Sequence, residues 1–242
     1  MHKLLFTTRG HSGALTYASK ELEGNGWIKS DTAPVVILPV PSFDPGGNLT
    51  GGGCLNDLEK DRIIIGGNLT PDITRKHRHL DLLKNPLYLS ENALITAHCA
   101  LCIAMENLSV TLSDCSALVI GWGRIGKHLA RLLRLLGAQV TIAARSESDR
   151  ALTEALGYAV MDTADETADL SKFRVIFNTV PAMVLPEERM VLCRKDCLKI
   201  DLASKPGIGG SDVIWARGLP SLDAPESSGK LIAKIIRKEF EG

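Results

Sequence analysis

The feature that most constrains this chain is the stretch at residues 117–146, which reads ALVIGWGRIGKHLARLLRLLGAQVTIAARS. It opens with a short apolar run rich in β-branched residues and then breaks at three glycines. Beyond them, leucine and isoleucine recur at three- and four-residue spacing until Gly137, which is typical of an amphipathic helix with a glycine stop. The stretch therefore predicts a strand, a tight turn, a helix and a second strand at residues 139–144.

The three glycines follow the GxGxxG spacing of dinucleotide-binding turns. In that motif they allow a tight turn, close approach of the backbone to a diphosphate, and close helix–strand packing. The alternative is a glycine-rich structural turn. Here, however, the motif follows a strand, opens a helix and lies in a βαβ unit of about thirty residues. We therefore predict a nucleotide site that contains Gly121, Trp122, Gly123, Arg124, Ile125 and Gly126.

The end of the second strand indicates which cofactor binds. Arg145 stands where many such domains carry an acidic residue, which binds the ribose 2′-hydroxyl and repels a 2′-phosphate. A guanidinium instead pairs with that phosphate, and Ser148 and Arg150 could add donors. We predict NADP as the cofactor; NAD is the alternative if Arg145 is only a solvated surface residue. The residues predicted to hold this end of the cofactor are Ala144, Arg145 and Ser146.

Composition bounds the class of protein. The 242 residues carry 28 basic and 28 acidic side chains, and this length suits one large or two small domains. Zero formal net charge argues against bulk nucleic-acid binding, and the basic run at residues 74–84 is interpreted as a solvated helical face. No apolar stretch approaches the length of a membrane span. The apolar core of the N-terminal segment is too short for a signal peptide. We predict a cytoplasmic protein that binds neither nucleic acid nor a membrane.

Six cysteines raise the question of metal or redox chemistry. Cys99 and Cys102 form a CxxC beside His98, but they lie in an apolar helical pattern, where free cysteine behaves as a small hydrophobic residue. Cys193 and Cys197 form a second, looser pair. Redox CxxC pairs usually open a helix after a strand, and zinc knuckles sit on turns. The sequence therefore predicts no metal site, and the role of the six cysteines stays open.

The chain is predicted to divide near residue 115 into a small N-terminal α/β domain (1–115) and a dinucleotide-binding domain (116–242). The first domain has apolar strands at residues 3–8, 33–40 and 62–67 and helices at 13–22 and 74–83. The Gly- and Pro-rich segment 41–57 is a loop, either a mobile lid or a disordered insertion. A connecting helix covers residues 91–108.

Strands and helices alternate in the second domain, which predicts a doubly wound parallel sheet of the Rossmann type. The expected strands are at 117–120, 140–144, 159–161, 174–180, 197–204 and 216–219. A terminal amphipathic helix, with Ser227 or Ser228 as N-cap, is expected to cross back to the first domain. Its predicted apolar face consists of Leu231, Ile232, Ile235, Ile236 and Phe240.

Polar residues at consecutive strand ends are site candidates, because these ends line the ligand crevice of a parallel sheet. Past one strand, the residues expected to meet the nicotinamide end of the cofactor are Asn178, Thr179, Val180 and Pro181. Past the next strand stand Asp201, Ala203 and Lys205, of which Ala203 is assigned to the cofactor. The catalytic candidates are Lys205, Asp201 and His98. Their alternatives are a surface lysine, an acceptor for loop amides and a core histidine.

Four ordered motifs carry a family resemblance: GWGRIGKHLARLLRLLGAQVTIAARS, FNTVPAMVL, IDLASKPG and GLPSLDAPESSGKLIA. Together they resemble the family of dipicolinate synthase A subunits from spore-forming bacteria, over essentially all of the second domain and more faintly before it. The resemblance implies a role in sporulation: oxidation of a dihydrodipicolinate-type intermediate to dipicolinate with NADP or NAD, alongside a separate, flavoprotein-like B subunit. Under this reading the cyclic dicarboxylate lies between the domains and meets Pro41, Ser42, Gly67, Asn68, Lys205, Ser227 and Ser228.

The sequence also departs from the family. The first domain is abbreviated between its first helix and VVILPV, Ile208 and Gly209 are extra, and His98 stands where an acidic residue is expected. We therefore expect a partner, either the B subunit or a second copy in a homo-oligomer, to complete the site. Two alternatives stay open: a dehydrogenase of the 2-hydroxyacid or shikimate type, and a non-catalytic NADP-binding protein. The first lacks a convincing Arg, Glu and His set after the glycine motif.

Overall fold

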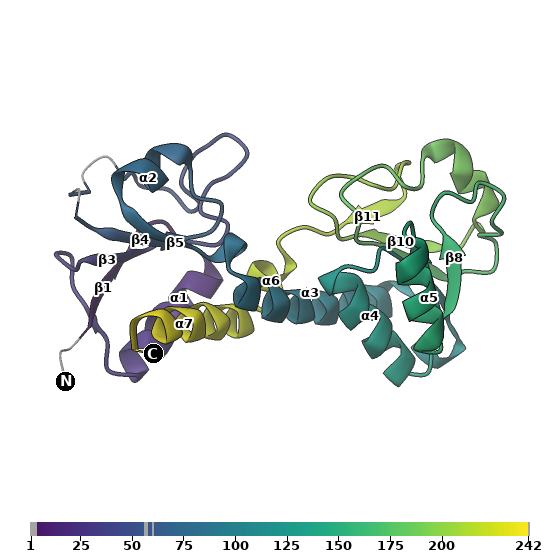
Figure 1. Cartoon of the computed structure of the whole chain (residues 1–242), viewed down its shortest axis with the longest axis horizontal. Helices are drawn as coiled ribbons and strands as arrows, with labels where there is room; N and C mark the ends of the chain where they lie inside the picture. The colour runs from purple at the N-terminus through teal and green to yellow at the C-terminus, as the bar shows by residue number, and fades with distance from the viewer. Residues whose placement is uncertain (1–3, 56–57, 60, 242) are drawn as a thin grey trace. The chain divides into compact units, whose positions relative to one another are not determined.

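The computed structural model describes residues 4–55, 58–59 and 61–241. The chain forms two compact units, Met1–Ile95 with Pro220–Gly242 and Thr96–Leu219, called here the first and second unit (Figure 1). Helix α3 (Pro86–Asn107) begins in the first unit and ends in the second. The division therefore falls inside this helix and not near residue 115. One reason is that its first turns pack on the first core, where Tyr88 is buried.

The first unit contains a parallel five-stranded sheet in the order β2-β1-β3-β4-β5. Its strands are β1 (Leu5–Thr8), β2 (Ile28–Lys29), β3 (Val35–Ile37), β4 (Ile63–Gly66) and β5 (Arg78–Asp81). The three apolar strands expected from the sequence are present, except that Lys3 lies outside the described residues. The sequence analysis missed the two edge strands, β2 and β5. Both residues of β2 are exposed, and β5 reads RHLD, so neither has the apolar pattern of a buried strand.

The predicted helix at residues 74–83 is wrong in its second half. Helix α2 (Pro71–Lys76) ends at His77, the chain then pairs with β4 as strand β5, and a short 3-10 helix (Leu82–Lys84) follows. Arg78 and His79 are exposed on this edge strand. The basic run is solvated as expected, but largely on a strand, because pairing with β4 outweighs the local helical pattern.

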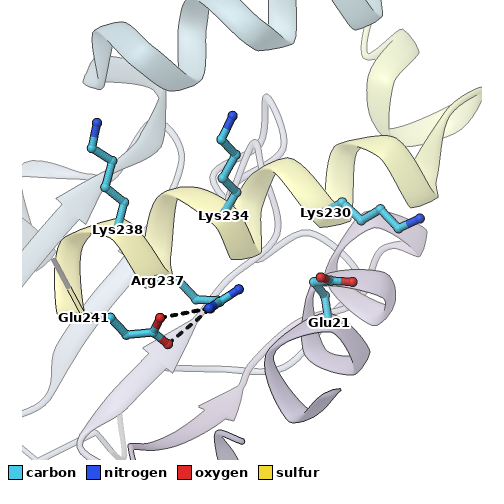
Figure 2. A pocket seen from close by; sticks show the side chains of 6 residues that line it. All are labelled: Glu21, Lys230, Lys234, Arg237, Lys238 and Glu241. Atoms are coloured by element: carbon cyan, nitrogen blue, oxygen red, sulfur yellow. Dashed lines mark hydrogen bonds and ion pairs between the residues drawn. The ribbon is translucent and has the colours of Figure 1, made fainter. Parts of the chain in front are cut away.

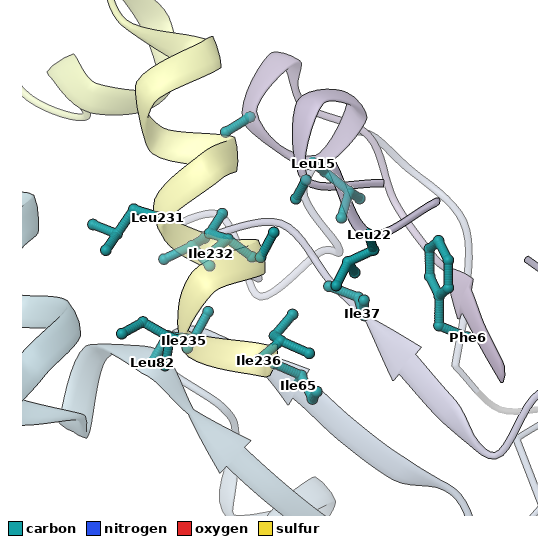
Figure 3. Packing of buried hydrophobic residues seen from close by; sticks show 14 of the residues in the cluster. Phe6, Leu15, Leu22, Ile37, Ile65, Leu82, Leu231, Ile232, Ile235 and Ile236 are labelled. Carbon is teal, nitrogen blue, oxygen red and sulfur yellow. The ribbon is translucent and has the colours of Figure 1, made fainter. Parts of the chain in front are cut away.

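Helices α1 (Gly13–Gly24) and α7 (Pro225–Glu241) pack together on one face of this sheet (Figure 1). Gly229 lets them approach closely: a Cβ there would lie 2.5 Å from the Cβ of Tyr17. The predicted apolar face of α7 meets Leu15 and Leu22 of α1 and the strand residues Ile37 and Ile65 (Figure 3). Its predicted N-cap was wrong, because α7 starts at Pro225, two to three residues earlier.

The other face of the first sheet is covered by α2 and by the segment after β3. This segment is organised by its own hydrogen bonds: the Asp44 carboxylate accepts from the backbone N–H of Asn48 at 2.8 Å, and Phe43 and Leu49 form a β-bridge. Leu49 is buried against Leu38 and Ile64. The described part of the Gly- and Pro-rich loop is thus a folded loop. Residues 56 and 57 of the predicted stretch lie outside the described residues.

Helix α3 corrects one prediction about the sequence. It is 22 residues long, and its most apolar window has a mean hydropathy of 1.3, so by length and composition it could cross a membrane. The statement that no apolar stretch approaches that length was therefore wrong. In the structure 44% of this window is buried inside the protein.

The second unit contains a six-stranded parallel sheet in the order β11-β10-β9-β6-β7-β8, which confirms the doubly wound prediction. The strands are β6 (Ser116–Ile120), β7 (Gln139–Ala144), β8 (Ala159–Asp162), β9 (Val175–Asn178), β10 (Leu198–Asp201) and β11 (Val213–Trp215). The strand expected at 216–219 was wrong, since β11 ends before it. Gly218 there has φ +69°, and a short helix, α6 (Leu219–Leu222), follows.

Helices α4 (Arg124–Leu135) and α5 (Glu147–Ala155) cover one face of the second sheet. A 3-10 helix (Leu112–Asp114) precedes β6. The other face is covered by turns at residues 163–174 and by a 3-10 helix (Glu187–Leu192), whose side chains join a core that includes Leu118, Ile120 and Ile176. The strand order reverses between β6 and β9, and this is the point where doubly wound sheets bind ligands.

Candidate functional site

The glycine motif forms the turn between β6 and α4, at the point where the strand order reverses. Gly121 has φ +104°, and a Cβ there would lie 2.4 Å from Thr179 Oγ1. A Cβ on Gly126 would lie 2.1 Å from the carbonyl oxygen of Gly121. Both positions therefore require glycine, because any side chain would push α4 and the β9 loop away from the turn.

Gly123 has a different environment, because it faces open space. It is the N-cap of α4, and a Cβ placed on it would meet no described atom within 4 Å. The first turn of α4, which begins with Arg124 and Ile125, contains no acidic residue. Free backbone N–H groups and the positive end of the helix dipole thus remain available at an open surface. This arrangement fits the diphosphate of a dinucleotide.

Trp122 lies within the same turn. Its ring meets Tyr158 edge-on, with the centroids 5.8 Å apart, and the Lys127 ammonium lies 5.8 Å from its centroid. The indole Nε1 is buried and has no hydrogen-bond partner among the described residues. A buried donor without an acceptor costs about 1–3 kcal/mol. A bound group that brought an acceptor to this turn would remove that cost.

Arg145 follows the last residue of β7, Ala144, and is exposed. Its guanidinium makes no hydrogen bond or ion pair with any described residue. Ser146 caps α5, and its hydroxyl lies 2.7 Å from that of Ser148. A cation that pairs with no described residue and two hydroxyls therefore stand together at the end of β7.

Arg150 does not belong to this group, although the sequence analysis offered it as a further donor. Its Nη1 donates to the carbonyl oxygens of Ala144 at 3.0 Å and Arg145 at 2.7 Å, and it pairs with Asp162 at 2.8 Å. These bonds fix the backbone at the end of β7. Sequence reasoning missed Asp162 because the strand was expected to end at Met161. Asp162 and the neighbouring Thr163 also line a small cavity of about 20 Å³ at this edge of the sheet.

The loop after β9 is held by its own side chains. Asn178 is buried; its amide donates to the carbonyl of Val180 at 3.0 Å and accepts the Val180 N–H at 2.9 Å. Thr179 donates through both its N–H and its hydroxyl to Ile120 O, each at 2.9 Å. The side chains of Asn178 and Thr179 thus clamp the loop onto β6. Exposed Pro181 is the member of the predicted set left facing solvent.

Asp201 is 1% exposed and accepts four hydrogen bonds. Oδ1 accepts from the Asn178 amide at 2.9 Å and the Ala203 N–H at 3.0 Å. Oδ2 accepts from the N–H groups of Gly207 at 2.6 Å and Ile208 at 3.1 Å. This is the structural alternative that the sequence analysis considered for Asp201. The same bonds occupy the Ala203 amide, so it is not free for the cofactor.

Lys205 and His98 are both exposed, and neither is joined to Asp201 by a hydrogen bond or ion pair of the described residues. Lys205 lies in the turn after β10, where its ammonium can meet an incoming anion. His98 lies on α3, within a helix and not at its end. The three catalytic candidates therefore form no hydrogen-bonded group.

Of the candidates in the first unit, Ser42 and Gly67 have structural roles. The buried Ser42 hydroxyl donates to Pro39 O at 2.8 Å and accepts the Gly67 N–H at 2.9 Å. A Cβ on Gly67 would lie 2.7 Å from Val40 Cγ1. Pro41 and Asn68 are exposed, and Asn68 has φ +60° with its N–H bound to the Asp81 carboxylate at 3.0 Å.

The two candidate serines of α7 also differ in burial and in hydrogen bonding. Ser228 is buried, and its hydroxyl is hydrogen-bonded to the side chain of Tyr88, whose pKa is raised by burial to about 12. Ser227 is exposed in the first turn of the helix. Of the two, Ser227 therefore retains a hydroxyl and an early-turn amide facing solvent.

An open groove of about 500 Å³ runs along α7, lined by Glu21, Lys230, Lys234, Arg237, Lys238 and Glu241 (Figure 2). Its cations are largely paired: Lys230 with Glu226 at 2.6 Å, Lys234 with Glu91 at 2.7 Å. Arg237 pairs with Glu241 at 3.0 Å, as the dashed lines in Figure 2 show. Such exposed pairs form a solvated helix surface, and we assign no site to the groove.

Comparison with known proteins agrees with this geometry. The family model for the NAD-binding domain of D-isomer specific 2-hydroxyacid dehydrogenases matches residues 104–196. The A subunit of dipicolinate synthase from Bacillus subtilis (strain 168) is 28% identical over 157 residues, covering 61% of this chain and 52% of that protein. In this alignment the chain spans about half the length of the curated relative.

Solved structures show the same fold over nearly the whole chain. The dipicolinate synthase A chain of Bacillus subtilis has a TM-score of 0.83 at 21% identity, covering 100% of this chain and 97% of that one. The corresponding A subunit from Bacillus halodurans has a TM-score of 0.85 at 19% identity, covering 99% and 98%. A transhydrogenase from Sinorhizobium meliloti follows with a TM-score of 0.72 at 12% identity, covering 98% and 93%.

These comparisons confirm three predictions: the resemblance to the dipicolinate synthase A subunit, the α/β fold with a Rossmann-type NAD-binding domain, and the NAD(P)-dependent oxidoreductase type. The coarse conclusion is a dehydrogenase-like protein with a nicotinamide cofactor.

Proposed function

We propose that this chain is an NADP-dependent oxidoreductase that resembles the dipicolinate synthase A subunit and oxidises a dihydrodipicolinate-type intermediate to dipicolinate by hydride transfer. The single observation that carries the cofactor assignment is the exposed Arg145 at the end of β7, which pairs with no described residue. It stands beside a glycine turn whose open side suits a diphosphate. The substrate assignment rests on the likeness to the Bacillus subtilis protein.

Within this proposal the residues of the second unit divide the work of binding. The N–H groups at the start of α4 bind the diphosphate, with Gly123 allowing its close approach. Arg145 pairs with the 2′-phosphate, and the hydroxyls of Ser146 and Ser148 donate to it. When bound, the nicotinamide supplies a hydride acceptor. The clamped loop at 178–181 holds the reacting end in place.

Lys205 is the residue that we assign to a substrate carboxylate. Its ammonium is exposed at the carboxyl end of β10, and a small, doubly charged substrate needs a cation there to fix its orientation. In the first unit, Pro41, Asn68 and Ser227 remain candidates for contact with the dicarboxylate, whereas Ser42 and Ser228 are occupied by other bonds.

Asp201 is excluded as the proton acceptor in this proposal, because its two oxygens already accept four N–H groups. Aromatisation of the ring supplies the driving force, so the protein mainly positions the reactants. A partner, either a B subunit or a second copy of this chain, is proposed to complete the enclosure of the substrate. Efficient dipicolinate formation by the purified chain, at concentrations where light scattering shows a monomer, would remove that requirement.

The second candidate is a dehydrogenase for 2-hydroxyacids, which the matching family model favours. Such an enzyme needs an acid–base group near the cofactor, and histidine serves this role most often. The sequence contains no histidine after His128 in α4, so none follows any of the strand ends that line the nicotinamide side. This argues for the first candidate.

The test of the cofactor assignment is titration calorimetry with NADP and NAD on the wild-type chain and on Arg145→Asp. We expect NADP to bind at least tenfold tighter to the wild type, a difference of about 1.4 kcal/mol, and the order to reverse in the variant. Arg131→Asp, an exposed arginine on α4, makes the same change of charge away from the turn and should keep the wild-type preference. Equal affinities that do not respond to Arg145→Asp would contradict NADP as the cofactor.

A further inference from the structure

We propose that Cys193 and Cys197 form a peroxide-sensitive dithiol that closes to a disulfide. The pair lies in the second unit, in the connection between β9 and β10. The proposed nucleotide site uses neither residue, and both are reduced in the structure.

The backbone brings the two thiols together. The 3-10 helix Glu187–Leu192 ends at Cys193, whose N–H donates to Met190 O at 3.1 Å. A tight turn follows, in which the Cys197 N–H donates to Arg194 O at 3.1 Å. The turn CRKDC folds the chain back, so that the side chains of Cys193 and Cys197 are hydrogen-bonded to each other and pack on the same apolar core.

The two thiols differ in exposure and therefore in role. Cys193 is half-buried, whereas Cys197 is buried. Hydrogen bonding with the Cys197 side chain lowers the pKa of Cys193 to about 7, and the nearby Lys199 ammonium acts in the same direction. The same contact, together with burial, raises the pKa of Cys197. At neutral pH the accessible thiol is thus the one with thiolate character, and a protonated partner lies beside it.

The chemistry balances with a hydroperoxide as the oxidant. The Cys193 thiolate attacks one peroxide oxygen, the O–O bond breaks, and the other oxygen leaves and takes up a proton as water or an alcohol. This gives a sulfenic acid at Cys193. The Cys197 sulfur then attacks the Cys193 sulfur, the S–O bond breaks, and the hydroxide that leaves takes the Cys197 proton to form water. The dithiol loses two electrons and the peroxide gains them.

Other cysteines provide internal controls. Cys54 and Cys102 are exposed, and the structure gives neither a thiol contact within its described residues. Cys99 and Cys102 form the CxxC of the sequence, yet one is buried and the other exposed on the same helix. No group of three or more His, Cys, Asp or Glu suited to a metal occurs among the described residues. A disulfide between Cys193 and Cys197 is therefore the redox product that the geometry favours.

The experiment is peptide mapping of the full chain after treatment with hydrogen peroxide, with free thiols blocked by N-ethylmaleimide. Trypsin cleaves after Arg189, Arg194, Lys195 and Lys199, so the two cysteines fall in separate peptides, MVLCR and DCLK. We expect these peptides to appear joined without reductant, lighter than their sum by two hydrogen atoms, and to separate after reduction. Cys102→Ser should give the same joined product, and Cys193→Ser should not.

Three results would overturn the proposal. The first is Cys193 recovered only as sulfinic or sulfonic acid, which would show that Cys197 does not resolve the intermediate. The second is joining of either peptide mainly to another cysteine. The third is full maleimide labelling of both residues at a peroxide dose that oxidises exposed Cys54. Circular dichroism of Cys193→Ser checks that loss of the product does not reflect loss of the fold.

Discussion

The role of Asp201 can be tested by the substitution Asp201→Asn, which preserves size and removes one acceptor oxygen. The carboxylate binds two donors on each oxygen: the Asn178 amide and the Ala203 N–H on Oδ1, and the N–H groups of Gly207 and Ile208 on Oδ2. An asparagine keeps one acceptor, so whichever way its amide points, an NH₂ group faces two buried donors. Two buried N–H groups then lose their partner.

The magnitude follows from these contacts. Leaving a buried donor unsatisfied costs about 1–3 kcal/mol, and hydrogen bonds to a charged acceptor lie at the upper end of this range. Two such losses amount to a destabilisation of about 4 kcal/mol. This is a large part of the free energy of unfolding of a typical protein, which is about 5–15 kcal/mol. Exposed Asp169, which accepts from the N–H and hydroxyl of Ser171, is the matched control, because Asp169→Asn keeps an acceptor oxygen and should change stability by less than about 0.5 kcal/mol.

The assay is urea unfolding followed by tryptophan fluorescence, since Trp122 and Trp215 both lie in the second unit, together with steady-state turnover below the transition. We expect the unfolding midpoint of Asp201→Asn to fall strongly, while the folded fraction retains measurable turnover. A variant as stable as the wild type but with turnover reduced more than about a hundredfold would refute the structural role and show that Asp201 acts in proton transfer.

Three further predictions concern the binding residues and the first core. Lys205→Ala should lower kcat/KM by an amount equivalent to about 2–3 kcal/mol with cofactor affinity unchanged. The control variant at an exposed lysine, Lys195→Ala, should leave kcat/KM unchanged. Normal turnover by Lys205→Ala would show that Lys205 is only a surface lysine. Gly126→Ala places its Cβ 2.1 Å from a carbonyl oxygen and should lower the melting temperature. Gly123→Ala has open space around its Cβ and should weaken only cofactor binding, measured by calorimetry. Equal melting temperatures of the two variants would contradict this prediction. Burial raises the pKa of Tyr88 from 10 to about 12, so as pH rises the unfolded chain loses the Tyr88 proton before the folded chain does. The free energy of unfolding therefore keeps its full value below pH 10 and falls by about 3 kcal/mol towards pH 12. Tyr88→Phe should lack that part of the loss in urea melts at pH 9 and pH 12.

Local patterns in the sequence were enough to predict some elements and not others. The β6–α4–β7 stretch was predicted correctly because its apolar period, glycines and helix stop are all contained within thirty consecutive residues. Strands β2 and β5 were missed because they lie at sheet edges, where pairing with β1 and β4 forms them without an apolar pattern.

The same distinction applies to the site. The strand-end rule selected Asn178 and Asp201. However, a polar residue at a strand end gives the same sequence pattern whether its side chain binds a ligand or its own loop. The bond between these two residues joins positions 23 residues apart, and the contact of Ser228 with Tyr88 joins α7 to α3. Neither partner is visible without the fold. The prediction for Arg145 is of another kind, because it depends only on the position of this residue after the glycine motif.

The pairing of α1 with α7 has a consequence for synthesis of the protein. The second unit is one continuous stretch of chain, Thr96–Leu219, whereas the first unit is made of both ends. A ribosome therefore finishes the nucleotide-binding unit before it has made Leu231, Ile232 and Ile236, which complete the first core. Domains generally fold as units while the chain emerges, so here the segment made first must wait for the segment made last. Until then the apolar face of α1 and its sheet has no cover, which makes it a natural target for a chaperone that binds nascent chains.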